Sequence, residues 1–119
     1  MDAEQLKDRT KKMSLEVFRL VAPIPRGREV DVIVKQIIRS SSSVAANYRA
    51  ACKARSKADF ISKIGIVEEE ADETAFWLEY LIDLDLVDST RAEPLLTEVK
   101  ELVAIFTASG KTAKQNRLK

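Results

Sequence analysis

Residues 29–53 read EVDVIVKQIIRSSSSVAANYRAACK, and this stretch places an apolar or small side chain at every third or fourth position. That spacing aligns the side chains along one stripe of an α-helix, because residues three and four apart are neighbours on a helix surface. A stripe that mixes large residues with serine and alanine predicts a helix packed closely against another helix. The stripe consists of Val30, Val34, Ile37, Ser41, Val44, Tyr48 and Ala51.

Three similar stripes predict helices at residues 4–21, 57–83 and 91–110. Prolines and a glycine separate the first two helices within residues 22–27, and Ser56 and Thr90 are expected to cap the third and fourth. Because the connections are short, consecutive helices must run antiparallel. The sequence therefore predicts an all-α, antiparallel up-and-down four-helix bundle, with a basic tail at residues 111–119. The three stripes comprise Leu6, Thr10, Met13, Val17 and Leu20; Phe60, Ile64, Val67, Ala71, Thr74, Leu78 and Leu81; and Leu95, Val99, Leu102, Phe106 and Ser109.

Composition indicates one domain over residues 1–119. Only three glycines and three prolines occur in 119 residues, which favours long helices with few turns. No run approaches the roughly 20 apolar residues of a membrane-spanning helix. Cys52 is the only cysteine, so no intrachain disulfide can form, and we expect a reducing, cytoplasmic location.

The sequence lacks the residue patterns on which enzymes usually depend. It contains no histidine, so the Glu-x-x-His motif of di-iron bundles cannot be built and a serine has no histidine base. Neither Gly-rich phosphate-binding motif is present. Glu68 and Asp72 could hold a hard cation across subunits, but a solvated acidic face is the favoured interpretation. We therefore predict a protein that is not an enzyme and has no cofactor or metal.

The faces behind two of the stripes predict self-association. Behind the stripe of helix 29–53 lie basic side chains, and behind that of helix 57–83 lie acidic side chains followed by two aromatics. Exposed aromatics rimmed by charge suggest a partner surface, although a loop or the tail could cover them instead. A head-to-tail contact between the two stripes of neighbouring subunits would close into a ring. The predicted interface residues are Arg39, Arg49, Lys53, Glu69, Glu73, Phe76 and Tyr80.

Charge segregation leaves nucleic-acid binding open as an alternative. Basic residues outnumber acidic ones before residue 59, acidic residues dominate 59–101, and residues 102–119 contain no acid. A ring would repeat any basic surface and so favour contacts with RNA or DNA phosphates. Against this, the net charge is only +1, and no set of stacking aromatics accompanies the basic residues. The candidate nucleic-acid-binding residues are Lys11, Lys12, Arg55, Lys57, Lys111 and Lys114.

Over about residues 8–114 the chain resembles the bacterial four-helix bundle proteins encoded in intervening sequences of large-subunit ribosomal RNA genes. The resemblance rests on Gln36-Ile37-Ile38-Arg39, on Ser43-Val44-Ala45-Ala46-Asn47 and on Arg55-Ser56-Lys57-Ala58-Asp59-Phe60. It continues through residues 63–73 and 77–79 and resumes weakly at 101–106. Where many members carry Ala-Glu-Gly, this chain has Arg49-Ala50-Ala51, so any role of that glutamate does not carry over.

The resemblance implies an antiparallel bundle that assembles into a ring-shaped homopentamer, without an established activity. A related branch, the accessory proteins of diversity-generating retroelements, binds nucleic acid and a reverse transcriptase through a strongly basic pentamer. This chain is not strongly basic. We therefore expect a scaffold or interaction role for the ring, with RNA or DNA binding as the alternative.

Overall fold

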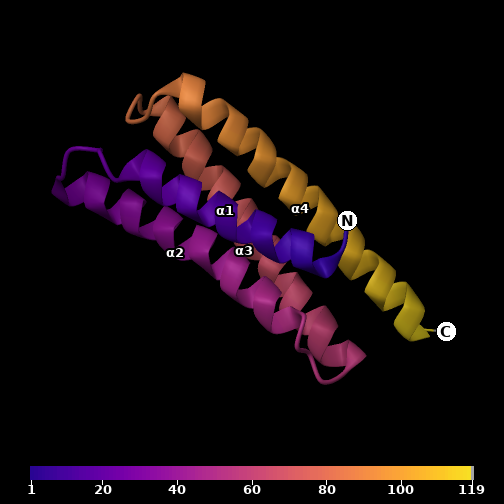
Figure 1. The fold of residues 1–119 in the computed structure, drawn as a ribbon. Helices are drawn as coiled ribbons and strands as arrows, with labels where there is room; N and C mark the ends of the chain where they lie inside the picture. Colours follow the sequence, from indigo (N-terminus) through magenta and orange to yellow (C-terminus); the bar gives the residue numbers. More distant parts are fainter. Residues whose placement is uncertain (119) are drawn as a thin grey trace.

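The computed structural model describes residues 1–118, with side chains through residue 116, as four α-helices in an elongated bundle (Figure 1). They are α1 (Ala3–Val21), α2 (Arg28–Ala51), α3 (Lys57–Asp83) and α4 (Ser89–Leu118). The described residues contain no strand. Consecutive helices lie side by side in opposite directions, and α1 also lies along α4 (Figure 1). This arrangement confirms the predicted all-α fold and the four predicted helices.

The predicted stripes form the core of the bundle. All five residues of the first stripe are buried, and so are most of the other three stripes. The stripe residues that are only partly buried are Val30, Val34, Phe60, Leu95 and Ser109. The sequence pattern did not identify Ala92 as a core residue, although it is fully buried. The largest fully buried side chain is Phe106, whose ring lies 5.3 Å from that of buried Tyr48.

Side chains cap the helices where short polar residues precede them. Asp2 and Gln5 form a reciprocal capping box at the start of α1. Ser56 accepts a hydrogen bond from the Asp59 backbone N–H at 3.0 Å, as predicted for α3. At α4 the prediction was wrong: Asp88 accepts from the backbone N–H and the hydroxyl of Thr90, at 3.0 and 2.7 Å. The cap therefore lies two residues earlier than expected.

The C-terminal end of α4 differs from the prediction. The helix does not end at residue 110 but continues to Leu118, so residues 111–118 are not a separate tail (Figure 1). Nothing between Gly110 and Leu118 stops a helix, because a single glycine costs only about 1 kcal/mol relative to alanine. Lys119, and the side chain of Arg117, which were also assigned to the tail, lie outside the described residues.

Candidate interaction surfaces

Arg39 on α2 joins the acidic side of α3 within the same chain. Its guanidinium donates to Glu70 at 2.8 Å and also to Glu73, and these contacts raise the pKa of Arg39, chiefly through the hydrogen bond to Glu73. The charged stripes of the sequence predicted such pairs between subunits. The structure instead forms them between the antiparallel neighbours α2 and α3, because Arg39 lies level with both glutamates along the bundle.

An aromatic cluster occupies the outer side of α3 beside this ion pair. The ring of Phe76 lies 4.9 Å from that of Trp77 and 5.8 Å from that of Tyr80, and the rings of Trp77 and Tyr80 are 5.6 Å apart. Trp77 also donates its indole N–H to Glu73 at 3.1 Å. Phe76 is 53% exposed and Tyr80 is 43% exposed. Because α4 runs along a different side of α3, no described loop or helix covers the two rings, so the predicted aromatic surface faces solvent.

The other predicted interface residues do not gather around this cluster. Arg49 and Lys53 are exposed at the C-terminal end of α2, on the opposite half of the bundle from Phe76. Glu69 is exposed on the α3 face that also carries the cluster. Of these three, none forms an ion pair with another described residue. The structure thus brings together Arg39, Glu73, Phe76 and Tyr80 and leaves the basic end of α2 apart.

Four of the six candidate nucleic-acid residues lie at that basic end. Arg55 and Lys57 line a hollow of about 640 Å³ together with Ala113 and Asn116 of α4. The neighbouring α4 residues Lys111 and Lys114 are exposed. These residues are far apart in sequence, and they meet because the α2–α3 connection and the C-terminal end of α4 share one end of the bundle (Figure 1). Lys11 and Lys12 lie apart from them on α1.

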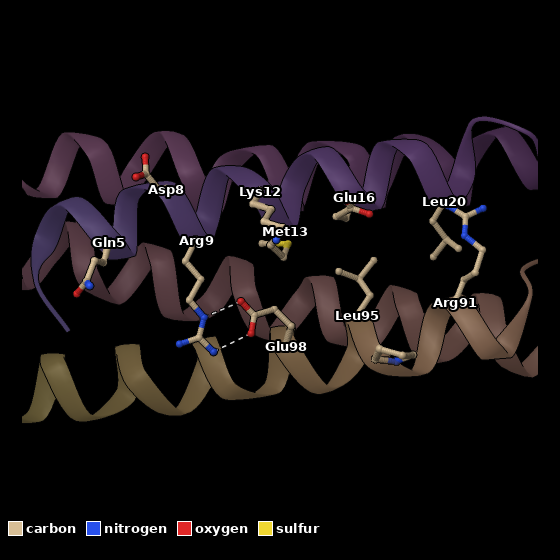
Figure 2. Close-up of a pocket in the computed structure, with 11 residues that line it drawn as sticks. Gln5, Asp8, Arg9, Lys12, Met13, Glu16, Leu20, Arg91, Leu95 and Glu98 are labelled. Atoms are coloured by element: carbon tan, nitrogen blue, oxygen red, sulfur yellow. Dashed lines mark hydrogen bonds and ion pairs between the residues drawn. The ribbon is translucent and has the colours of Figure 1, made fainter.

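A groove between α1 and α4 was not predicted. It has a volume of about 720 Å³, and Met13, Leu20 and Leu95 extend into it (Figure 2). Arg9 crosses from α1 to Glu98 of α4, with Nε and Nη2 at 2.6 and 2.7 Å from the two carboxylate oxygens (Figure 2). The pair α1–α4 has the fewest contacts of the four adjacent helix pairs. This ion pair therefore joins the two helices where apolar packing between them is sparse.

Three exposed apolar residues were also missed by the sequence analysis. Leu15 and Phe18 on α1 are 44% and 56% exposed, and Val32 on α2 is 57% exposed. Their exposure could have been predicted from helical periodicity, because all three lie off the buried stripe of their helix. Because the antiparallel register sets Ser40 against Thr74, Val32 lies level with the C-terminal end of α3.

The described residues offer little for catalysis. In residues 1–118, no group of three or more potential metal-ligating side chains lies close enough to hold an ion. Cys52 is exposed, and burial together with a hydrogen bond to Cys52 raises the pKa of Tyr48 above its usual range. No helix within the described part of the chain is long and apolar enough to cross a membrane.

Comparison with known proteins identifies the family. The model of the 23S rRNA-intervening sequence proteins matches residues 4–108. The chain belongs to this family. The family match confirms the resemblance noted in the sequence. It covers α1–α3 and most of α4, including the aromatic cluster and the α1–α4 groove.

A solved structure from the family has the same fold. It is a protein of unknown function from the S23 ribosomal protein family of Bacteroides thetaiotaomicron, with a TM-score of 0.83 and 32% sequence identity. The match covers 93% of this chain and 99% of that one. No curated protein matches the chain. Neither the family match nor the solved structure points to catalysis, and neither names a function that could be carried over.

Proposed function

We propose that the protein is a self-assembling, non-enzymatic helical bundle whose assembled form serves as a scaffold or interaction platform. The observation that carries this proposal is the exposed aromatic cluster of Phe76, Trp77 and Tyr80 on α3. Aromatic side chains are enriched in the buried centres of protein interfaces, where they provide most of the binding free energy. Burying a large apolar side chain that was fully exposed contributes about 1.5–3 kcal/mol of favourable free energy. Rings that stay in water do not gain this contribution.

The cluster is also ordered before any partner binds. Edge-to-face contacts hold the three rings against one another, and the indole hydrogen bond to Glu73 fixes Trp77. Arg39 in turn fixes Glu73. A surface that is already ordered loses less conformational entropy on association, which favours binding. The assembly that we propose is a homopentameric ring, as the family resemblance implies.

The absence of histidine from the sequence supports a non-enzymatic role, because general acid–base and nucleophilic mechanisms most often use this residue. An exposed, single Cys52 suits a reducing compartment, so we also propose a cytoplasmic location.

The test is the mass of the protein by light scattering coupled to size exclusion. We expect an oligomer for the wild type and a monomer for the double variant Phe76→Asp/Tyr80→Asp. The matched control is Ala104→Asp/Ala108→Asp, which adds two acids four residues apart on the exposed side of α4 and should keep the wild-type mass. A monomeric wild type would refute the proposal.

Binding of RNA or DNA is the second candidate function. It is favoured by the basic hollow at the end of the bundle, where Arg55 and Lys57 lie beside the segment that carries Lys111 and Lys114. Such a cluster can neutralise several phosphates, which makes affinity strongly dependent on salt. A ring would repeat the cluster once per subunit and strengthen its field.

This second candidate is tested by fluorescence anisotropy with mixed RNA at low and high salt. We expect binding at low salt that weakens as salt rises, and a loss of affinity in Arg55→Glu/Lys57→Glu. Lys35→Glu/Lys100→Glu removes the same charge from exposed positions elsewhere and serves as control. A flat titration at low salt would exclude nucleic acid as the ligand.

A further inference from the structure

A second exposed apolar surface lies on α1. Leu15 and Phe18 are three residues apart and therefore adjacent on the outer side of the helix, where they are 44% and 56% exposed. Lys11 and Lys12 are exposed one turn before them, and Arg19 follows. Arg19 is paired with Glu16 at 3.1 Å, and exposed Asp8 lies three and four residues before the two lysines, so two lysines and one aspartate leave one net positive charge on this side. We call Leu15, Phe18, Lys11 and Lys12 the α1 patch.

The aromatic side of α3 has the opposite charge. Phe76 and Tyr80 are followed one turn later by Leu84, which is 49% exposed. The exposed carboxylates on this side of the helix include Asp72 and Asp83, which form no ion pair with any residue of known position. We call Phe76, Tyr80, Leu84, Asp72 and Asp83 the α3 patch. An apolar centre with an acidic rim complements an apolar centre with a basic rim.

The two patches lie on different sides of the bundle. The helix α1 packs against α2 and α4, and α3 packs against the same two helices, whereas α1 and α3 do not contact each other. They are therefore diagonal, and their outer sides face away from one another. One subunit can present its α1 patch to one neighbour and its α3 patch to another at the same time, which is the arrangement that a head-to-tail ring requires.

From this arrangement we infer that the α1 patch of one subunit binds the α3 patch of the next. The inference rests on the proposed self-association and names both halves of its contact. It also replaces the α2 stripe expected from the sequence. Arg39 of that stripe is already bonded to Glu70 and Glu73, and Arg49 and Lys53 lie at the far end of α2. The α1 patch, in contrast, combines exposed apolar side chains with unpaired lysines.

Complementation between two variants tests the inference. Leu15→Asp/Phe18→Asp loses the α1 patch, and Phe76→Asp/Tyr80→Asp loses the α3 patch, so each should be monomeric. An equimolar mixture contains one intact copy of each patch and should form a heterodimer, which cannot grow further. Light scattering at the highest soluble concentration reports the masses, and circular dichroism checks that both variants are folded. A milder variant, Lys11→Glu/Lys12→Glu, alters only exposed charges and should weaken the assembly most at low salt.

The outcomes separate this inference from the proposal on which it rests. A monomeric wild type overturns both. An oligomeric Leu15→Asp/Phe18→Asp variant, or folded monomeric variants that remain monomers when mixed, overturns the α1–α3 contact and leaves self-association intact. An assembly of Lys11→Glu/Lys12→Glu that is as stable as the wild type at low salt also counts against it. The head-to-tail contact is established if the mixture forms a heterodimer while each variant by itself stays monomeric.

Discussion

The hydroxyl oxygens of Thr74 and Ser40 are hydrogen-bonded to each other across 2.9 Å, between two side chains that are both fully buried, and the Thr74 hydroxyl also lies 2.8 Å from the carbonyl oxygen of Glu70, which can only accept. Ser40 can in turn donate to the carbonyl oxygen of Ile37 at 3.3 Å. The pair joins α2 to α3 at the centre of their contact, and small side chains there allow the two helices to approach closely. The apolar stripe of α2 included Ser41 but not Ser40, so the sequence did not reveal this bond.

Removing one partner of this pair should cost more than the loss of a hydroxyl at the surface. We expect Thr74→Val to lower the free energy of unfolding by about 1–3 kcal/mol, because the buried hydroxyl of Ser40 then loses its interhelical hydrogen-bond partner. The double variant Ser40→Ala/Thr74→Val should be less destabilised than the sum of the single variants. Urea denaturation measures all three, and strict additivity would show that the bond contributes nothing.

Arg39→Ala should separate an intrachain from an intersubunit role of this residue. Because the Arg39 side chain is 50% exposed, we expect a loss of at most about 1 kcal/mol in the free energy of unfolding. The mass in solution should stay that of the wild type. Thermal denaturation and light scattering give the two values. Dissociation into monomers would show that assembly depends on Arg39, either through a pair between subunits or through the order that it gives to Glu73 and Trp77.

Asp85 ends α3 in a left-handed conformation, with a φ of 55°. The backbone N–H groups of Asp85 and Leu86 bond to the carbonyls of Ile82 and Leu81, both at 3.0 Å, which is the Schellman pattern that glycine usually completes. We therefore expect Asp85→Gly to stabilise the protein by about 0.5–1 kcal/mol and Asp85→Ala to destabilise it. Melting temperatures of the two variants should move in opposite directions, and a lower value for the glycine variant would contradict the assignment.

Acid should destabilise the bundle through three aspartates, of which Asp31 and Asp59 are half-buried and Asp88 is exposed. The pKa of Asp59 is lowered chiefly by its hydrogen bond to Lys63, that of Asp31 by Arg26 and that of Asp88 by Thr90. A lowered pKa in the folded state means that the stabilising effect is complete above the unfolded value near 3.8 and is lost as pH falls through the folded pKa.

Melting temperatures measured from pH 7 down to pH 3 should therefore be flat above about pH 5 and then fall. Asp59→Asn should have a lower melting temperature than the wild type at neutral pH. Its melting temperature should also fall less on acidification, because asparagine has no carboxylate to protonate. High salt should reduce the difference, since the pair is partly exposed. An equally steep acid decline in the variant would show that Asp59 does not contribute.

Arg9 holds α1 to α4 where packing between the two helices is sparse. It contacts Glu98 through two nitrogens and also Glu101 at 2.5 Å, and its side chain is only 23% exposed. We expect Arg9→Ala to cost about 1–2 kcal/mol, between the values for exposed and buried pairs. Hydrogen exchange should accelerate in α1 before α3, and uniform acceleration would show that α1 does not open separately.

The sequence by itself determined the fold of this protein. The stripe from Leu6 to Leu20 and that from Ile64 to Leu81 are buried as predicted. A helix with apolar side chains on one side packs with that side toward the core, which fixes its rotation about its own axis. Ser56 capped α3 as expected, since a cap depends only on neighbouring residues. The sequence also identified Phe76 and Tyr80 as exposed aromatics from their angle to the stripe.

Only the tertiary structure decided which residues from different helices meet. Helical periodicity fixes the angle of a side chain around its own helix but not its level beside a neighbouring helix. That level sets Arg39 against Glu70 and Glu73, Arg9 against Glu98, and Ser40 against Thr74. It also pairs Arg39 with Glu73 within one chain, although the sequence predicted that both would face a neighbouring subunit. The exposed surface of α1 at Leu15 and Phe18 was recognised only from the structure, whereas Phe76 and Tyr80 of α3 were predicted from the sequence.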